Sequence, residues 1–249
     1  MYDLTGKTAV ITGGSSGIGE AAAYALAVAG AHVVIGDISE DRALVVANAI
    51  NKAGYSCEAR YVDVTDERSV DSLIDGTVHS NNCIDILFSN AGILLDQKFE
   101  EITSADWKKV MDVNVTGTFY ACRAAIRHMK QRKYGKIIIT SSVGGKMSHP
   151  TAGVHYISSK GALMAFTRHL ANQVGQYGIN VNSIAPGTTM TPMIAHRGEK
   201  VFKAISDKIP MGRLGASHEM AGAVLYLSSD QSSFITGEIV DVNGGLYID

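Results

Sequence analysis

Near its start the chain reads Thr8-Ala-Val-Ile-Thr-Gly-Gly-Ser-Ser-Gly-Ile-Gly19, and an alanine-rich run follows as far as Ala29. The β-branched run Thr8–Thr12 predicts a buried strand, and the apolar spacing over Ile18–Ala29 predicts a helix. Glycines at a strand-to-helix turn let the backbone approach a ligand closely, and the first N–H groups of a helix attract phosphate. The spacing Gly-x-x-x-Gly-x-Gly from Gly13 matches neither GxGxxG nor a P-loop. The stretch predicts a phosphate-binding turn, with a purely structural turn as the alternative.

The same alternation of strand and helix patterns continues along the chain. The expected strands are Thr8–Thr12, His32–Gly36, Glu58–Val62, Ile84–Ser89, Lys136–Thr140, Asn180–Ala185 and Glu238–Val242. The expected helices are Ile18–Ala29, Glu40–Ala53, Glu67–Ser80, Trp107–Gln131, Tyr156–Tyr177 and His218–Ser228. Strands that are apolar almost throughout are typical of a parallel sheet covered on both faces. The pattern therefore predicts an α/β fold, a doubly wound, Rossmann-like parallel sheet of about seven strands with helices on both faces.

No linker, repeat or charge block divides this pattern, so residues 1–249 are expected to form a single domain. The exception to the alternation is the segment 188–215, which holds Pro192, Pro210 and three of the nine methionines. Insertions of this kind often form binding loops. We therefore expect residues 188–215 to cover a substrate.

Composition narrows the possible partners. The 249 residues carry 22 Lys and Arg against 24 Asp and Glu, a net charge of −2, which gives no electrostatic reason to expect nucleic acid or a membrane as partner. Cys57, Cys83 and Cys122 are odd in number and widely spaced, which predicts neither a disulfide framework nor a metal site. No signal-sequence pattern and no apolar stretch of membrane-spanning length is present. The expected location is cytoplasmic.

Asp37 stands at the end of the second expected strand, 20 residues after Gly17. A carboxylate at this position accepts hydrogen bonds from the hydroxyls of an adenosine ribose and repels a 2′-phosphate. Its neighbours Ser16 and Ile38 offer no cation to such a phosphate. The pattern predicts NAD rather than NADP as the cofactor, and a helix N-cap role near Ser39 is the alternative.

Tyr156-Ile-Ser-Ser-Lys160 opens an expected helix, and the i, i+4 spacing places the phenol and the ammonium on one face. A nearby Lys⁺ and a cationic nicotinamide favour the phenolate, which lowers the pKa of the tyrosine. Such a phenol can move a proton while hydride is transferred. The spacing alone is common on solvated helix faces, so its meaning depends on the other motifs.

Seven motifs in order resemble those of the short-chain dehydrogenase/reductase family. They are Thr12–Gly19, Asp63-Val64, Asn90-Ala91-Gly92, Asn114-Val115-Thr116-Gly117, Ser141-Ser142, Tyr156 with Lys160, and Pro186-Gly187. The resemblance covers the whole chain, and each motif lies at a strand end or on a helix, where doubly wound sheets bind ligands. It implies an NAD-dependent short-chain alcohol dehydrogenase or ketoreductase, with the nicotinamide carrying the hydride.

The resemblance also implies roles for individual residues. Tyr156 resembles the general acid/base, Lys160 the group that lowers its pKa and binds the nicotinamide ribose, and Ser142 the partner of the substrate oxygen. Asn114 resembles the residue that holds a water linking Lys160 to solvent. The residues expected to contact the cofactor are Gly13, Ser15, Ser16, Gly17, Ile18, Gly19, Asp37, Asp63, Val64, Asn90, Ala91, Gly92, Tyr156, Lys160, Pro186, Gly187, Thr189 and Thr191.

Three of these assignments leave alternatives open. Asn114 is alternatively a buried amide whose hydrogen bonds are satisfied inside the protein. Ser141 is the alternative to Ser142 as the active hydroxyl. His149 and His155 flank the site in sequence, where a substrate contact competes with an ordinary loop or surface histidine.

The substrate pocket is expected to draw on Val143–Val154 and Thr188–Phe202. The residues expected at its wall are Gly144, Met147, His149, Val154, Met190 and Met193. A mostly apolar wall with adaptable methionines predicts a small neutral secondary alcohol or ketone as the substrate.

The sequence leaves two alternative functions open, and the resemblance implies one assembly. The first alternative is an NADPH-dependent 3-oxoacyl-carrier-protein reductase of the same family, against which Asp37 and the net charge argue. The second is a non-catalytic dinucleotide-binding protein, against which the presence of Tyr156 and Lys160 argues. The resemblance further implies a homotetramer formed through the helices expected at Trp107–Gln131 and Tyr156–Tyr177.

Overall fold

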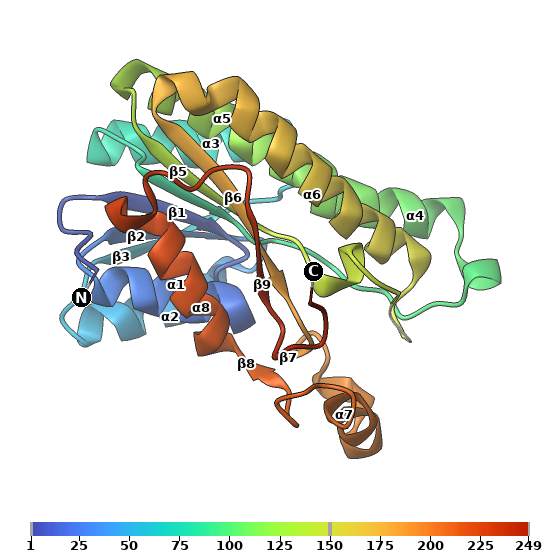
Figure 1. Ribbon diagram of the computed structural model, residues 1–249. Helices are drawn as coiled ribbons and strands as arrows, with labels where there is room; N and C mark the ends of the chain where they lie inside the picture. Colours follow the sequence, from blue (N-terminus) through green and yellow to red (C-terminus); the bar gives the residue numbers. More distant parts are fainter. Residues whose placement is uncertain (1, 149–150, 249) are drawn as a thin grey trace.

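A seven-stranded parallel sheet forms the centre of the computed structural model, which describes residues 2–148 and 151–248 (Figure 1). The strand order is β3-β2-β1-β4-β5-β6-β9. The strands are β1 (Thr8–Thr12), β2 (His32–Asp37), β3 (Cys57–Tyr61), β4 (Ile86–Ser89), β5 (Gly135–Thr140), β6 (Ile179–Pro186) and β9 (Ile239–Val242). The predicted doubly wound fold is confirmed.

Helices cover both faces of this sheet, as Figure 1 shows. One face carries α1 (Gly17–Val28), α2 (Glu40–Lys52) and α8 (Ser217–Ser228). The other carries α3 (Glu67–Asn81), α5 (Gly117–Arg132) and α6 (Val154–Val174), with α4 (Ser104–Met111) packed against α6. No helix among residues 2–148 and 151–248 is long and apolar enough to cross a membrane.

The two layers of helices explain why the strands are apolar throughout. Successive side chains of a strand point to opposite faces. In β1, Ala9 and Ile11 pack into the core beneath α1 and α8, whereas Val10 packs into the core beneath α3 and α5. Val10 also pairs in register with Val34 on one side and Leu87 on the other. Each residue of β1 is buried, so a polar alternation would have been costly.

The strand order reverses between β1 and β4, and this reversal positions the site. Chain connections leave β1 for β2 and β3 on one side, then return to place β4 on the other side. The loops that follow β1 and β4 therefore diverge and leave a crevice at the carboxyl ends of the strands.

The helix predicted over Trp107–Gln131 is divided in the structure. A π-helical turn, Asp112–Thr116, separates α4 from α5. Asn114 lies within this turn and hydrogen-bonds the backbone of Ile93 with both its side-chain oxygen and nitrogen. The division was not predicted, because the local pattern of apolar residues carries no sign of a side-chain bond to the loop after β4.

The segment 188–215 forms a small subdomain rather than an irregular loop. It contains a 3₁₀ turn at Ala195–Arg197 and the short helix α7 (Glu199–Ser206). Its start, β7 (Thr189–Met190), pairs in parallel with β8 (Gly215–Ala216). The two-strand pairing closes the segment at its base, with α7 projecting from the sheet (Figure 1).

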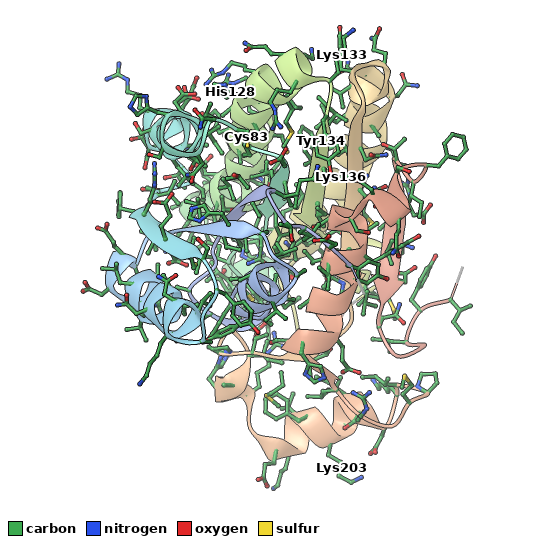
Figure 2. All side chains as sticks on the ribbon, turned by 90° about the vertical axis from the view of Figure 1, so that its left-hand side faces the viewer. Cys83, His128, Lys133, Tyr134, Lys136 and Lys203 are labelled. Atoms are coloured by element: carbon green, nitrogen blue, oxygen red, sulfur yellow. The ribbon has the colours of Figure 1, made fainter. Side chains whose placement is uncertain are left out.

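The opposite end of the sheet is held by buried polar contacts. Asp85 is 1% exposed, and its Oδ2 accepts a hydrogen bond from the Thr8 amide at 2.9 Å. Its Oδ1 pairs with Arg132 at 2.7 Å. Figure 2 shows Cys83, Tyr134 and Lys136 toward this end, far from Lys203 on α7. These contacts serve the fold, because they lie away from the carboxyl ends of the strands.

Candidate active site

A cavity of about 480 Å³ opens at the carboxyl ends of β1, β4, β5 and β6. Its wall includes seventeen of the eighteen residues expected to contact the cofactor, together with Ser142. Those that line it are Gly13, Ser15, Ser16, Gly17, Ile18, Asp37, Asp63, Val64, Asn90, Ala91, Gly92, Ser142, Tyr156, Lys160, Pro186, Gly187, Thr189 and Thr191. Motifs distant in sequence therefore meet on one surface.

The turn after β1 forms an anion cradle at one side of this cavity. Gly13 and Gly17 have φ angles of +67° and +57°, which favour glycine. No side-chain hydrogen bond caps α1 at Ser16, so the first N–H groups of the helix are available to a phosphate. The Ser15 hydroxyl oxygen is buried without a partner. These features fit the pyrophosphate of a dinucleotide.

Gly19 was expected to contact the cofactor, but it does not line the cavity. A Cβ at this position would lie 2.1 Å from the Gly13 carbonyl oxygen and 2.7 Å from Asn90 Nδ2. Gly19 therefore permits the close approach of α1 to the turn, and it acts on the cradle through packing.

Asp37 stands at the rim of the cradle. The side chain is buried, at 7% exposed, and Oδ2 accepts a hydrogen bond from the Ser15 amide at 3.1 Å. Oδ1 accepts one from the amide of Ser39, the N-cap of α2, at 3.0 Å. The carboxylate thus organises both turns while lining the cavity. Arg42, on α2, lines the same cavity and was missed because only the immediate neighbours of Asp37 were considered.

The two serines after β5 are distinguished by their hydrogen bonds. Ser141 is 1% exposed, and its hydroxyl donates to the Ile184 carbonyl at 2.7 Å. Ser142 Oγ accepts a hydrogen bond from the Gly144 amide at 3.1 Å, which leaves its own proton available. Ser142 is also close enough to the Tyr156 phenol to lower its pKa. The geometry favours Ser142 over Ser141 as the hydroxyl that faces a substrate.

Tyr156 and Lys160 converge at this end of the cavity, from the first turns of α6. The Lys160 side chain is buried, and Nζ donates to the Thr140 carbonyl at 2.7 Å and lies 5.6 Å from the centre of the Tyr156 ring. Burial lowers the pKa of Lys160 to about 8. Burial raises the pKa of Tyr156, although hydrogen bonding from Ser142 lowers it. The pKa of Tyr156 therefore does not fall in the structure, because burial outweighs the lowering effects of Ser142 and Arg197.

Asn114 does not line the cavity, and its side chain is fully committed within the protein. Oδ1 accepts from the Ile93 amide at 2.8 Å, and Nδ2 donates to the Ile93 carbonyl and to Ser159 Oγ at 3.1 and 3.0 Å. A Cβ at Gly92 would lie 3.3 Å from Asn114 Oδ1 and 3.6 Å from Lys160 Nζ. Asn114 thus lies near Lys160. The hydrogen bonds of Asn114 nevertheless match the alternative reading, in which it is a buried amide whose partners lie inside the protein.

The substrate end of the cavity differs most from expectation. Of the six residues expected at the wall, Met193 lines it, whereas Gly144, Met147, Val154 and Met190 do not, and His149 lies outside the described residues. Val154 and Met190 are instead exposed to solvent, at 39% and 44%. The rest of the wall comes from Val143, Ala152, Ile194 and Arg197, which lie in the two expected segments, and from Ile93 and Leu94, which do not. Ile93 and Leu94 directly follow Gly92, which is the signal that could have identified them.

His155 is fully buried and supports the start of α6. Its Nδ1 accepts the amide N–H of Tyr156 at 2.9 Å, and its Nε2 lies 3.1 Å from Gln97 Oε1. With Nδ1 accepting, Nε2 is the ring nitrogen placed to donate to Gln97. His155 does not line the cavity, so a substrate contact finds no support. In the described part of the chain, no cluster of three metal-binding side chains occurs.

Comparison with known proteins identifies relatives along the whole chain. A family model described as enoyl-(acyl carrier protein) reductase matches residues 13–247. The chain is 37% identical to 3-oxoacyl-(acyl-carrier-protein) reductase FabG of Aquifex aeolicus, over 98% of each chain. It is 35% identical to the protein of the same name from Escherichia coli, over 99% of each chain.

Solved structures agree with this finding. A short-chain type dehydrogenase/reductase from Mycobacterium marinum superposes with a TM-score of 0.95 at 35% identity, covering 99% of this chain and 98% of that one. A levodione reductase superposes with a TM-score of 0.92 at 31% identity, covering 97% and 98%.

Gly19→Ala is expected to deform the phosphate-binding turn, because the new methyl group would collide with the Gly13 carbonyl. We expect a loss of about 2 kcal/mol in the free energy of unfolding and at least tenfold weaker NADH binding, measured by urea titration and by nucleotide fluorescence. Gly222→Ala in α8 is the matched control, since a Cβ there meets nothing within 4 Å. Unchanged NADH affinity in Gly19→Ala would contradict the packing role.

Proposed function

Because the chain belongs to the short-chain dehydrogenase/reductase family, whose members are oxidoreductases that bind a nicotinamide dinucleotide, we propose that it reduces 3-oxoacyl thioesters with NADH. The observation that carries this proposal is the convergence of Tyr156, Ser142 and Lys160 at one end of a cavity whose other end holds Asp37. The relatives named 3-oxoacyl-(acyl-carrier-protein) reductase support the substrate class. They favour it over the small secondary alcohol or ketone that the sequence pattern predicts.

The side chains divide the proposed reaction between them. Bound nicotinamide supplies the hydride. The Tyr156 phenol donates its proton to the ketone oxygen, and the free proton of Ser142 hydrogen-bonds the same oxygen as it gains charge. The Lys160 ammonium then stabilises the phenolate that remains. The raised pKa of Tyr156 suits this direction, since the phenol keeps its proton at neutral pH.

A small neutral ketone or secondary alcohol remains the second candidate substrate. The observation that favours it is the apolar wall formed by Ile93, Leu94, Val143 and Ile194. Both candidates share the chemistry at the carbonyl and differ only in what is attached to it.

Purified protein is expected to oxidise NADH when supplied with acetoacetyl-N-acetylcysteamine, a 3-oxoacyl thioester. Tyr156→Phe should lower kcat by about 10²- to 10⁴-fold and leave the Kd for NADH within threefold, because the phosphate-binding turn and Lys160 remain in place. Tyr177→Phe, beyond the far end of α6, serves as the control and should retain full turnover. Faster turnover of simple ketones than of the thioester would instead favour the second candidate.

We also propose that Asp37 selects NADH. Its buried carboxylate at the cavity rim would repel the 2′-phosphate of NADPH, while Arg42 on the same wall would offset part of that repulsion.

Kinetics with both nucleotides test this selection. We expect kcat/KM to be at least about 30-fold higher with NADH than with NADPH, since two kcal/mol of repulsion corresponds to such a ratio. Asp37→Ser should reduce the ratio at least tenfold, whereas Asp41→Ser in the first turn of α2 should leave it unchanged. An equal or higher kcat/KM with NADPH in the unaltered protein would refute the proposal.

The pH dependence of reduction should report on Lys160. Its lowered pKa of about 8 means that the ammonium is present below pH 8 and is lost above it. Reduction is therefore expected to be nearly constant from pH 6 to about 7 and to fall as the pH rises through 8, in a plot of kcat/KM against pH. Lys160→Arg keeps its charge at high pH and should remove this fall. A fall at the same pH in that variant would assign it to another group.

The homotetramer stays a prediction. We propose that α4 and α5 contribute to it, because Trp107 and Phe119 are 42% and 41% exposed on these helices.

A further inference from the structure

An ion pair joins two loops beside the substrate end of the cavity. Arg197, from the segment 188–215, donates from Nε and Nη2 to the two carboxylate oxygens of Asp96 at 2.8 and 2.6 Å. The Arg197 side chain is 5% exposed and that of Asp96 is 28% exposed. Such a two-point bond fixes the plane of the guanidinium.

The two partners are placed differently with respect to the cavity. Arg197 lines it, together with Ile93, Leu94 and Ile194, whereas Asp96 stands behind it and does not. Among the described residues, none accepts a hydrogen bond from Arg197 Nη1, nor is Nη1 one of the buried side-chain atoms that lack a partner. Nη1 is therefore open to the cavity or its solvent.

The pairing decides which ligand chemistry this wall can recognise. An unpaired guanidinium would attract a carboxylate, but Asp96 already neutralises Arg197. What remains toward the cavity is a fixed, strong N–H donor with almost no net charge. The best partner for such a donor is an uncharged oxygen acceptor, because a carboxylate would give up its hydration without gaining a free cation.

Arg197 also lies near the group that acts on the ketone. Its charge lowers the pKa of Tyr156, and that of Asp96 raises it, so both side chains are within electrostatic reach of the phenol. In a 3-oxoacyl group, a second carbonyl stands two carbons from the one that is reduced. A wall with Tyr156 and Ser142 at one oxygen has a fixed donor available for the other.

We propose that Arg197, oriented by Asp96, is a specificity-determining residue that donates a hydrogen bond to a second, uncharged carbonyl of the substrate. The inference rests on the proposed function, because it concerns the same cavity and the same reduction. It predicts that substrates with an uncharged second carbonyl, such as 3-oxoacyl esters, are preferred both to simple ketones and to free 3-oxo acids.

Three small substrates separate these chemistries. Methyl acetoacetate carries the uncharged second carbonyl, 2-hexanone replaces the ester by a chain of equal length, and acetoacetate replaces it by a carboxylate. With NADH, the unaltered protein is expected to favour the ester over both others by about 10- to 100-fold in kcat/KM. Equal kcat/KM values for the ester and 2-hexanone would overturn the inference.

Variants then assign the preference to Arg197. Arg197→Met should lower kcat/KM for methyl acetoacetate by about 10- to 100-fold, mainly through KM, and change that for 2-hexanone less than threefold. Arg213→Met is the matched control, because Arg213 makes a similar two-point bond to Glu219 but lies outside this cavity. Equal losses on the ester and on 2-hexanone would show a general effect on Tyr156 and overturn the inference.

Asp96→Asn gives an independent test, which remains valid even if the Arg197→Met variant does not fold. Removing the carboxylate frees the charge of Arg197, so acetoacetate should gain at least tenfold relative to methyl acetoacetate. No change in this ratio would contradict the proposed pairing. If the Arg197-dependent preference holds but acetoacetyl-N-acetylcysteamine is not reduced, the inference stands and the proposed function fails.

Discussion

The side-chain amide of Asn90 joins the carboxyl ends of three central strands, and the site is built on these ends. Nδ2 donates to the Gly13 carbonyl at 2.9 Å, and Oδ1 accepts from Thr140 Oγ1 at 3.1 Å. These bonds join the ends of β1, β4 and β5, and an amide suits the position because it both donates and accepts. Lys160 is tied to the same point through the Thr140 carbonyl. The phosphate-binding turn and the proposed proton donor thus share one support.

The order of strands and helices could be predicted because burial on both faces leaves a clear pattern in each strand. Val10 and Ile11 belong to different cores, so β1 had to be apolar without interruption. Features that depend on distant partners could not be predicted in this way. The turn at Asp112–Thr116 depends on the backbone of Ile93, and β7 depends on its pairing with residue 215.

The candidate site could be predicted where motifs lie at strand ends, since these ends converge in any parallel sheet. Prediction failed where the environment determines the chemistry. The spacing of Tyr156 and Lys160 is visible in sequence, whereas the burial that raises one pKa and lowers the other is not. The residues near Met193 that form the wall come from loops whose paths follow no periodic pattern, and the pairing of Arg197 with Asp96 spans 101 positions.

The π-helical turn Asp112–Thr116 also determines how this chain would respond to a change in length. Each residue of a helix turns the chain by about 100°. The π-helical turn holds one residue more than an α-helical turn would, and it joins α4 to α5. Deleting one residue of the turn would let the two helices run on as one continuous α-helix, with Trp107 and Phe119 keeping the faces they have. The cost would fall on Asn114, whose bonds to the backbone of Ile93 depend on the widened turn. At this position a frame-preserving deletion would therefore leave the outer faces of both helices in place and act on the buried contact alone.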